Sequence, residues 1–129
     1  MKLVSSAALV ALICLTLACG YSHSMTPAGA GTMPTISTLS PTSTTAGHAM
    51  FVLTINGTNF NGNAVVNWNG TAQTTTPVSS AQLTISVPAS AVATSGSVQV
   101  TVTNPGTPGG QYGGGTMPET SNMMTFTIN

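Results

Sequence analysis

Charged side chains are almost absent from this chain. Lys2 is its single basic residue and Glu119 its single acidic residue, so the formal net charge at pH 7 is +0. A nucleic-acid-binding surface needs several Lys or Arg side chains facing the phosphates, and we therefore expect no nucleic-acid partner. Because 41% of the residues are hydrophobic, their burial can offset the chain entropy lost on folding, and we expect a folded domain.

Titratable side chains are also too few to favour catalysis. General acid–base chemistry needs a positioned pair of titratable groups, and beyond residue 18 the chain offers His23, His48 and Glu119. These three residues lie in separate parts of the sequence. We therefore predict that the protein is not an enzyme and that it uses no cofactor.

Histidine and methionine side chains raise one metal-binding alternative. The residues concerned are His23, Met25, His48, Met50, Met117, Met123 and Met124. Soft ligands of this kind suit Cu(I), so a Cu(I)-binding periplasmic protein is one alternative function. Their spacing is irregular, and Met50 and Met124 are equally suited to fill gaps in a core. We therefore predict no metal site.

Both cysteines lie in an N-terminal segment that is typical of export signals. Lys2 is followed by an uncharged, mostly apolar run from Leu3 to Ala18, which is the shape of a signal peptide. The run is shorter than the roughly 20 residues that a membrane-spanning helix needs. We predict that residues 1–18 form a signal-peptide helix that is removed after export.

The residues around the second cysteine resemble the bacterial lipobox. Residues 15–19 read Leu-Thr-Leu-Ala-Cys, with a small residue directly before Cys19. The resemblance implies that Cys19 becomes the mature N-terminus and carries a diacylglyceryl thioether, while Cys14 leaves with the signal peptide. Ordinary signal-peptidase cleavage that leaves Cys19 as a free thiol is the alternative. Gly20 does not resemble an inner-membrane retention signal, so we expect lipid anchoring at the outer membrane, on its periplasmic or surface face.

Composition divides the rest of the chain into two parts. Residues 19–33 are rich in Gly, Ser, Ala and Thr without periodicity, which predicts a flexible tether. In residues 34–129, short segments of alternating apolar and polar residues are separated by turn residues, which predicts one all-β domain. The predicted breaks are the Asn-Gly pairs at 56–57, 61–62 and 69–70 and the prolines at 41, 88 and 105.

Seven strands are expected, each with one apolar and one polar face. Their predicted ranges are 34–39, 49–56, 63–68, 71–76, 81–87, 96–103 and 122–128. Two antiparallel sheets can bury such faces against each other, so we predict a seven-stranded antiparallel β-sandwich of the immunoglobulin-like type. Ile36 and Leu39 have opposite parity in the first strand, which predicts a bulge there or a switch between the sheets.

Five segments in this order resemble the IPT/TIG family of immunoglobulin-like domains. They are residues 34–41 (PTISTLSP), 53–60 (LTINGTNF), 66–70 (VNWNG), 83–89 (LTISVPA) and 98–106 (VQVTVTNPG). The resemblance extends over residues 34–129 and implies an E-set type sandwich without an inter-sheet disulfide and without catalytic residues. It also implies that Gly57 turns the end of the second strand, that Phe60 plugs one end of the core and that Trp68 sits between the sheets.

A glycine-rich loop between residues 104 and 121 holds two candidate ligand contacts. Gln111 and Tyr112 lie between glycines, and an exposed Tyr can stack on a sugar ring or on a side chain. A solvent-exposed hairpin loop without a ligand is the alternative. No Lys follows Lys2 in the sequence, although Lys side chains commonly block strand pairing at sheet edges, so self-association through edge strands is a further prediction.

These features together predict a membrane-anchored, non-catalytic module of the cell envelope. It would bind a protein or glycan partner or serve as a spacer, and the tether would lift the domain from the lipid by a span on the order of 20 Å. A glycan-binding accessory module is the main alternative function.

Overall fold

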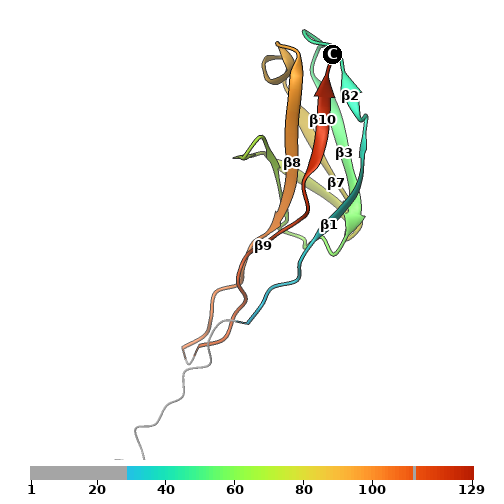
Figure 1. Ribbon diagram of the computed structural model, residues 1–129. Helices are drawn as coiled ribbons and strands as arrows, with labels where there is room; N and C mark the ends of the chain where they lie inside the picture. Colours follow the sequence, from blue (N-terminus) through green and yellow to red (C-terminus); the bar gives the residue numbers. More distant parts are fainter. Residues whose placement is uncertain (1–28, 112) are drawn as a thin grey trace, which may run out of the picture.

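The structure is a computed structural model that describes residues 29–111 and 113–129 (Figure 1). The predicted signal peptide, Cys19 and the greater part of the predicted tether lie outside these residues, and so does Tyr112. Predictions that concern those positions stay predictions. Within the described ranges, no helix is long and apolar enough to span a membrane.

Ten strands and one short 3-10 helix make up the regular structure of the described residues. They are β1 (Thr35–Ser40), β2 (Ser43–Thr44), β3 (Phe51–Thr58), β4 (Val65–Trp68), β5 (Thr71–Ala72), β6 (Thr75–Ser79), β7 (Gln82–Val87), η1 (Ala89–Val92), β8 (Gly96–Asn104), β9 (Glu119–Thr120) and β10 (Met124–Ile128). Strands β2, β5 and β9 have two residues each. The other seven follow the order of the predicted strands.

The strands form two sheets that pack face to face (Figure 1). One sheet has the order β1-β3-β7-β6, and the other has the order β2-β10-β8-β4-β5 with β9 paired to β8. The predicted immunoglobulin-like β-sandwich is confirmed. One pairing departs from the antiparallel prediction, since β2 runs parallel to β10. The chain passes from β1 in one sheet to β2 in the other, and there it runs in the same direction as β10.

The first strand shows both irregularities that its sequence parity predicts. Ile36 and Leu39 are each 3% exposed, although residues three apart on a regular strand face opposite sides. The pairing of β1 with β3 shifts register between Ile36 and Thr38, which brings both apolar side chains to the core. The chain then leaves this sheet after Ser40 and joins the other sheet as β2.

The predicted strand over residues 71–76 is wrong as a single element. Residues 71–72 pair with β4 as β5, whereas residues 75–79 pair with β7 in the other sheet as β6. Two hydrogen bonds hold the crossing point. The N–H of Gln73 donates to the carbonyl of Val66 at 2.8 Å, and the N–H of Val66 donates to Oγ1 of Thr75 at 2.9 Å. The crossing chain is thereby tied to β4 on its way to the second sheet.

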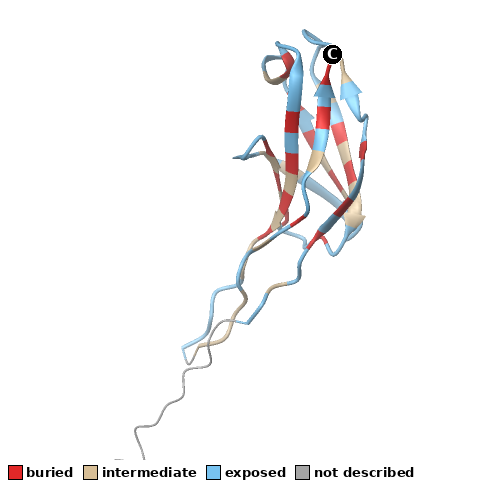
Figure 2. Ribbon diagram, viewed as in Figure 1, coloured by how far each residue is buried: buried red, intermediate tan, exposed pale blue. Residues whose placement is uncertain are grey.

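Apolar side chains from both sheets fill the space between them. Burial alternates along the strands (Figure 2), as on β8, where Val98, Val100 and Val102 face the core. Trp68 is 7% exposed, and its ring centroid lies 5.2 Å from that of the fully buried Phe126. The predicted position of Trp68 between the sheets is therefore confirmed.

The Asn-Gly pair at 56–57 does not end its strand as predicted. β3 continues through it, and the N–H of Gly57 donates to the carbonyl of Ala81 at 2.9 Å. A Cβ at residue 57 would collide with the carbonyl oxygen of Thr35 and with the ring of Phe60. Glycine is needed here for close packing, and Phe60, which is 4% exposed, closes this end of the core as predicted.

The other two Asn-Gly pairs lie in turns, as predicted. Asn69 and Gly70 have φ angles of 51° and 83° and connect β4 to β5. The pair at 61–62 begins a turn in which the N–H of Ala64 donates to the carbonyl of Asn61 at 3.0 Å. The breaks predicted at prolines 41, 88 and 105 are confirmed too, because β1, β7 and β8 each end at the residue before them.

Candidate functional site: a stem and an uncharged groove

A stem extends from one end of the sandwich (Figure 1). We define the stem as residues 29–33 together with residues 105–111 and 113–118, which run side by side with them beyond β9. The N–H of Gly29 donates to the carbonyl of Gly115 at 3.1 Å, and the N–H of Met117 donates to the carbonyl of Gly29 at 3.0 Å. The tether prediction includes residues 29–33, and these hydrogen bonds join Gly29, within that range, to residues 115 and 117.

Glycine allows the segments of the stem to approach each other closely. A Cβ at Gly31 would collide with the carbonyl oxygen of Met117, and one at Gly115 would collide with the carbonyl oxygen of Thr107. The N–H of Thr116 donates to the same Thr107 carbonyl at 3.1 Å. The glycine content of this region therefore permits main-chain packing.

A buried amide joins the stem to the sandwich. Asn104, the last residue of β8, is 1% exposed. Its Oδ1 accepts a hydrogen bond from the N–H of Asn61 at 3.0 Å, and its Nδ2 donates to the carbonyls of Thr32 and Asn59, each at 2.7 Å. Buried polar groups are stable when they are paired in this way. One side chain thus fixes β8, the loop after β3 and the stem to one another.

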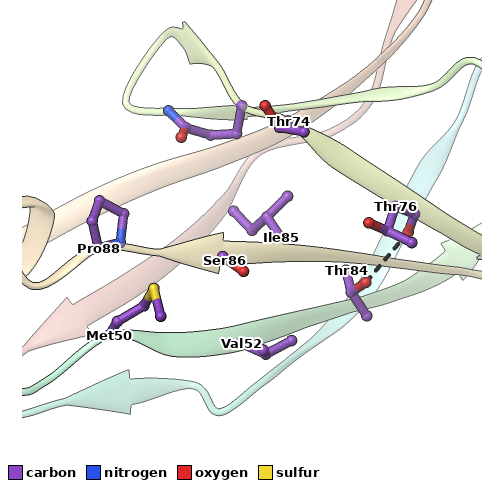
Figure 3. A pocket seen from close by; sticks show the side chains of 9 residues that line it. Met50, Val52, Thr74, Thr76, Thr84, Ile85, Ser86 and Pro88 are labelled. Atoms are coloured by element: carbon purple, nitrogen blue, oxygen red, sulfur yellow. Dashed lines mark hydrogen bonds between the residues drawn. The ribbon is translucent and has the colours of Figure 1, made fainter.

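A groove opens at the fork between β6 and β7 (Figure 3). Its volume is about 580 Å³, which lies in the range of small-ligand sites. The lining residues are Met50, Val52, Gln73, Thr74, Thr76, Thr84, Ile85, Ser86 and Pro88. The lining presents hydroxyl, amide and apolar groups, and none of these residues is charged. The groove can therefore make hydrogen bonds and apolar contacts but no ion pair.

The groove exists because β6 leaves β7 before β7 ends. Thr75, the first residue of β6, pairs with Ile85 of β7. From Ile85, β7 continues to Val87 beside β3. Beyond that pair, the chain on the β6 side turns toward the other sheet. The final residues of β7 therefore pair with β3 alone among the described strands.

Two exposed apolar side chains border the groove. Met50 is 69% exposed and Val52 is 57% exposed. The interpretation of Met50 as a core filler is wrong, because it precedes β3 and lies outside the buried alternation of that strand. Val52 lies on the outer face of β3, where Thr54 and Asn56 follow on the same side. An apolar residue on this otherwise polar face is the sequence signal from which the groove could have been found.

Comparison with known families identifies the domain. A family model described as IPT/TIG domain matches residues 34–121. The chain belongs to the IPT/TIG family. The resemblance found in the sequence is thereby confirmed, and the match begins at Pro34, where the β-domain was predicted to start. No curated protein matches the chain.

One solved structure is similar to much of this chain. It is an auxiliary nutrient binding protein from Bacteroides ovatus ATCC 8483, with 18% sequence identity and a TM-score of 0.45. The match covers 81% of this chain and 22% of that chain. This chain therefore corresponds to about a fifth of the length of that protein.

The predicted ligand contact Gln111 lies at the tip of the stem. It is exposed, in a turn that is closed by main-chain hydrogen bonds between Gly110 and Gly113 at 2.9 and 3.1 Å. Its predicted partner in ligand contact, Tyr112, lies outside the described residues. The groove lies toward the other end of the IPT/TIG domain, where β3 begins and β7 ends. The structure therefore does not bring Gln111 to the groove.

The candidate copper ligands of the described residues are not brought together. His48 and Met50 precede β3, at the end of the IPT/TIG domain away from the stem, whereas Met117 belongs to the stem. Met123 is 55% exposed, and Met124 packs against the core. In residues 29–111 and 113–129, no group of three or more His, Cys, Asp or Glu side chains is placed to hold a metal ion.

Both edges of the β1-β3-β7-β6 sheet have uncharged features that hinder pairing with another strand. The side chain of Asn122 pairs with the main chain of Ile36 in β1, with its Oδ1 accepting at 2.8 Å and its Nδ2 donating at 3.0 Å. At the other edge of the same sheet, β6 contains Pro77 and a register shift. Prolines, irregularities and short strands all discourage pairing with another chain. Self-association through an edge strand stays a prediction.

Proposed function

We propose that this protein is a lipid-anchored, non-catalytic IPT/TIG module of the bacterial cell envelope, which binds a partner or spaces one from the membrane. The stem is the observation that carries this proposal. It ties residues 29–33 to one end of the sandwich, downstream of the lipobox-like residues 15–19. An acyl chain on Cys19 would therefore hold the stem end of the domain toward the membrane.

The length of chain between the anchor and the stem supports this arrangement. Residues 20–28 separate Cys19 from Gly29, and a flexible coil of that length spans about 15–20 Å on average. Strand β8 has nine residues and, at about 3.3 Å per residue, extends for about 30 Å. The groove, which lies toward the far end of the sandwich, would then face away from the lipid headgroups.

The groove supports the binding role. Its uncharged lining favours an uncharged surface of a protein or glycan, because burying a charge without an ion partner is costly. The exposed Met50 and Val52 would add apolar contact area to such an interaction. A nucleic-acid partner does not fit, because the chain has one basic residue and phosphates need several Lys or Arg side chains.

The placement of titratable groups supports a non-catalytic role. His48 precedes β3 at the end of the sandwich where the N–H of Gly47 donates to the carbonyl of Val92. Glu119 lies in β9, opposite Asn104 in the strand pairing of β9 with β8 at the stem end. These two described side chains therefore lie at opposite ends of the domain and are too far apart to act on one substrate atom.

Mass spectrometry of the mature N-terminus tests the anchor. The full chain is produced in a bacterium that processes lipoproteins, together with Cys19→Ser and Cys14→Ser. We expect the wild-type protein to begin at an acylated Cys19 and to partition into detergent. Cys14→Ser should do the same, because Cys14 is predicted to leave with the signal peptide. Cys19→Ser should lose the acyl mass. An unmodified, freely soluble wild-type protein would overturn the proposal.

A pull-down with matched variants tests the groove as the binding surface. Val52 and Val78 are 57% and 58% exposed, but only Val52 lines the groove. We expect envelope components captured by the wild-type protein to be lost with Val52→Lys and kept with Val78→Lys. Equal capture by both variants would remove the groove from the proposed function and leave the anchor untouched.

A further inference from the structure

The three Asn-Gly pairs of the chain lie in two kinds of structure, and the difference has a chemical consequence. We propose that Asn61 and Asn69 are sites of spontaneous deamidation, whereas Asn56 is protected by the sheet. Neither the lipid anchor nor the groove takes part in this reaction, which slowly changes the charge of the protein.

Deamidation at such a pair proceeds through a cyclic imide. The main-chain nitrogen of the glycine attacks Cγ of the preceding Asn, loses its proton to solvent and displaces the side-chain nitrogen as ammonia. Water then opens the ring at one of its two carbonyl carbons. The product is either Asp or isoaspartate, in which the main chain runs through the side-chain carbon. Water is the only co-reactant, and no oxidant or reductant takes part.

The attacking nitrogen is free at the two turn sites. Asn61, Gly62, Asn69 and Gly70 are exposed, and among the described residues neither Gly62 nor Gly70 donates its N–H to a hydrogen bond. A Cβ at either glycine would meet no atom within 4 Å. The glycine nitrogen at each turn can therefore reach the Asn side chain without breaking a hydrogen bond of its own.

Both reacting groups are held at the third pair. The N–H of Gly57 is bonded to the carbonyl of Ala81 at 2.9 Å within the sheet. The side chain of Asn56 donates to Oγ1 of Thr38 at 3.3 Å and accepts from Nε2 of Gln82 at 3.1 Å. Ring closure there requires opening of β3, whose alternate residues are in the core. An opening close to global unfolding would slow the reaction at least about 10³-fold, given the usual stability of small domains.

The new charge is large relative to what the chain has. The unmodified protein has one acidic residue and a net charge of +0, so each deamidation adds one negative charge to a nearly neutral molecule. Modification at Asn61 also touches the base of the stem, since the N–H of Asn61 donates to Oδ1 of the buried Asn104. Isoaspartate at residue 61 would lengthen the main chain between that hydrogen bond and the turn. We therefore expect the modified protein to have a looser stem.

Peptide mapping of the aged protein tests the proposal. The purified full chain is incubated in neutral buffer at 37 °C, a standard condition, alongside synthetic peptides that contain each of the three pairs. Deamidated peptides are recognised by a mass increase of about 1 Da and by anion exchange. We expect modification at Asn61 and Asn69 and at all three synthetic peptides, with modification at Asn56 in the folded protein at least about 10³-fold slower than in its peptide.

Gly62→Ala provides the matched control variant. The added methyl group meets no neighbouring atom, but it hinders attack by the nitrogen of residue 62. Modification at Asn61 should fall strongly in this variant, while Asn69 should react as in the wild-type protein. The proposal is overturned if the folded protein modifies Asn56 as fast as the turn sites, or if Asn61 and Asn69 stay intact while their synthetic peptides react.

Discussion

The sandwich and the stem are stabilised by different means. The sandwich closes over a continuous core in which Leu53, Val66 and Phe126 are fully buried. Among the described residues of the stem, none is fully buried. Its segments are joined by main-chain hydrogen bonds such as that from Met117 to Gly29, and by contacts that only glycine permits. We infer that the sandwich sets the overall free energy of unfolding, whereas the stem opens locally at a lower cost.

The amide of Asn104 lies at the boundary between these two regions. It is bonded to the stem through Thr32 and to the sandwich through Asn59 and Asn61. The two regions therefore share one buried polar side chain. Substitutions placed in the core, at the boundary and in the stem should show how far each region depends on the other.

The largest effect is expected from emptying the core of the sandwich. Trp68→Ala should lower the free energy of unfolding by about 3–5 kcal/mol, because the large side chain packed on Phe126 is replaced by a cavity. Urea unfolding followed by circular dichroism measures this. Val52→Ala, at an exposed position, should change the same quantity by less than about 0.5 kcal/mol. A Trp68→Ala protein that is as stable as this control would refute the two-layer core.

An intermediate effect is expected at the boundary. Asn104→Ala should cost about 1–3 kcal/mol, because the N–H of Asn61 and the carbonyls of Thr32 and Asn59 lose their buried partner. Amide hydrogen exchange should show faster exchange at Asn61 and in the stem. Asn67→Ala, which removes half-buried hydrogen bonds to Thr101 and Thr103, should leave the stem unchanged. Equal exchange in both variants would contradict the linking role of Asn104.

The smallest effect on global stability is expected in the stem. Gly31→Ala places a methyl group against the carbonyl of Met117, so the stem must open while the sandwich stays folded. Urea unfolding should shift by less than about 1 kcal/mol, and the Met117 amide should exchange at least about tenfold faster. Gly62→Ala, where a Cβ meets no atom within 4 Å, should change neither. Loss of the whole fold in Gly31→Ala would mean that the two regions are not separable.

The same contrast explains what could be predicted from the sequence. Alternation of apolar residues, as in Val98, Val100 and Val102, has the period of a strand, so the sandwich followed from local patterns, and the resemblance to the IPT/TIG family added the core position of Trp68. The opposite parity of Ile36 and Leu39 even located the irregular first strand. Such patterns depend only on neighbours in the chain.

The stem and the groove depend on contacts between distant residues. Gly31 meets Met117, and Thr32 meets Asn104, and no local pattern encodes either pair. Their glycines and threonines have the composition of a flexible linker. Likewise, the split of residues 71–76 between two sheets, which creates the groove, depends on the bond from Gln73 to Val66. The exposed Val52 was a local signal, but it does not indicate which segment lies beside it.

Paramagnetic relaxation in a lipid bicelle tests the central claim most directly. The acylated full chain is placed in bicelles that contain a gadolinium-chelating lipid, and the broadening of each amide signal is measured by NMR. If Cys19 anchors the domain with its stem toward the membrane, broadening should be stronger at Thr107 and Thr116 in the stem than at Ala46 and Gly47. These two residues lie at the end of the sandwich opposite the stem. Equal broadening at both ends, stronger broadening at the far end, or no broadening at all would contradict it.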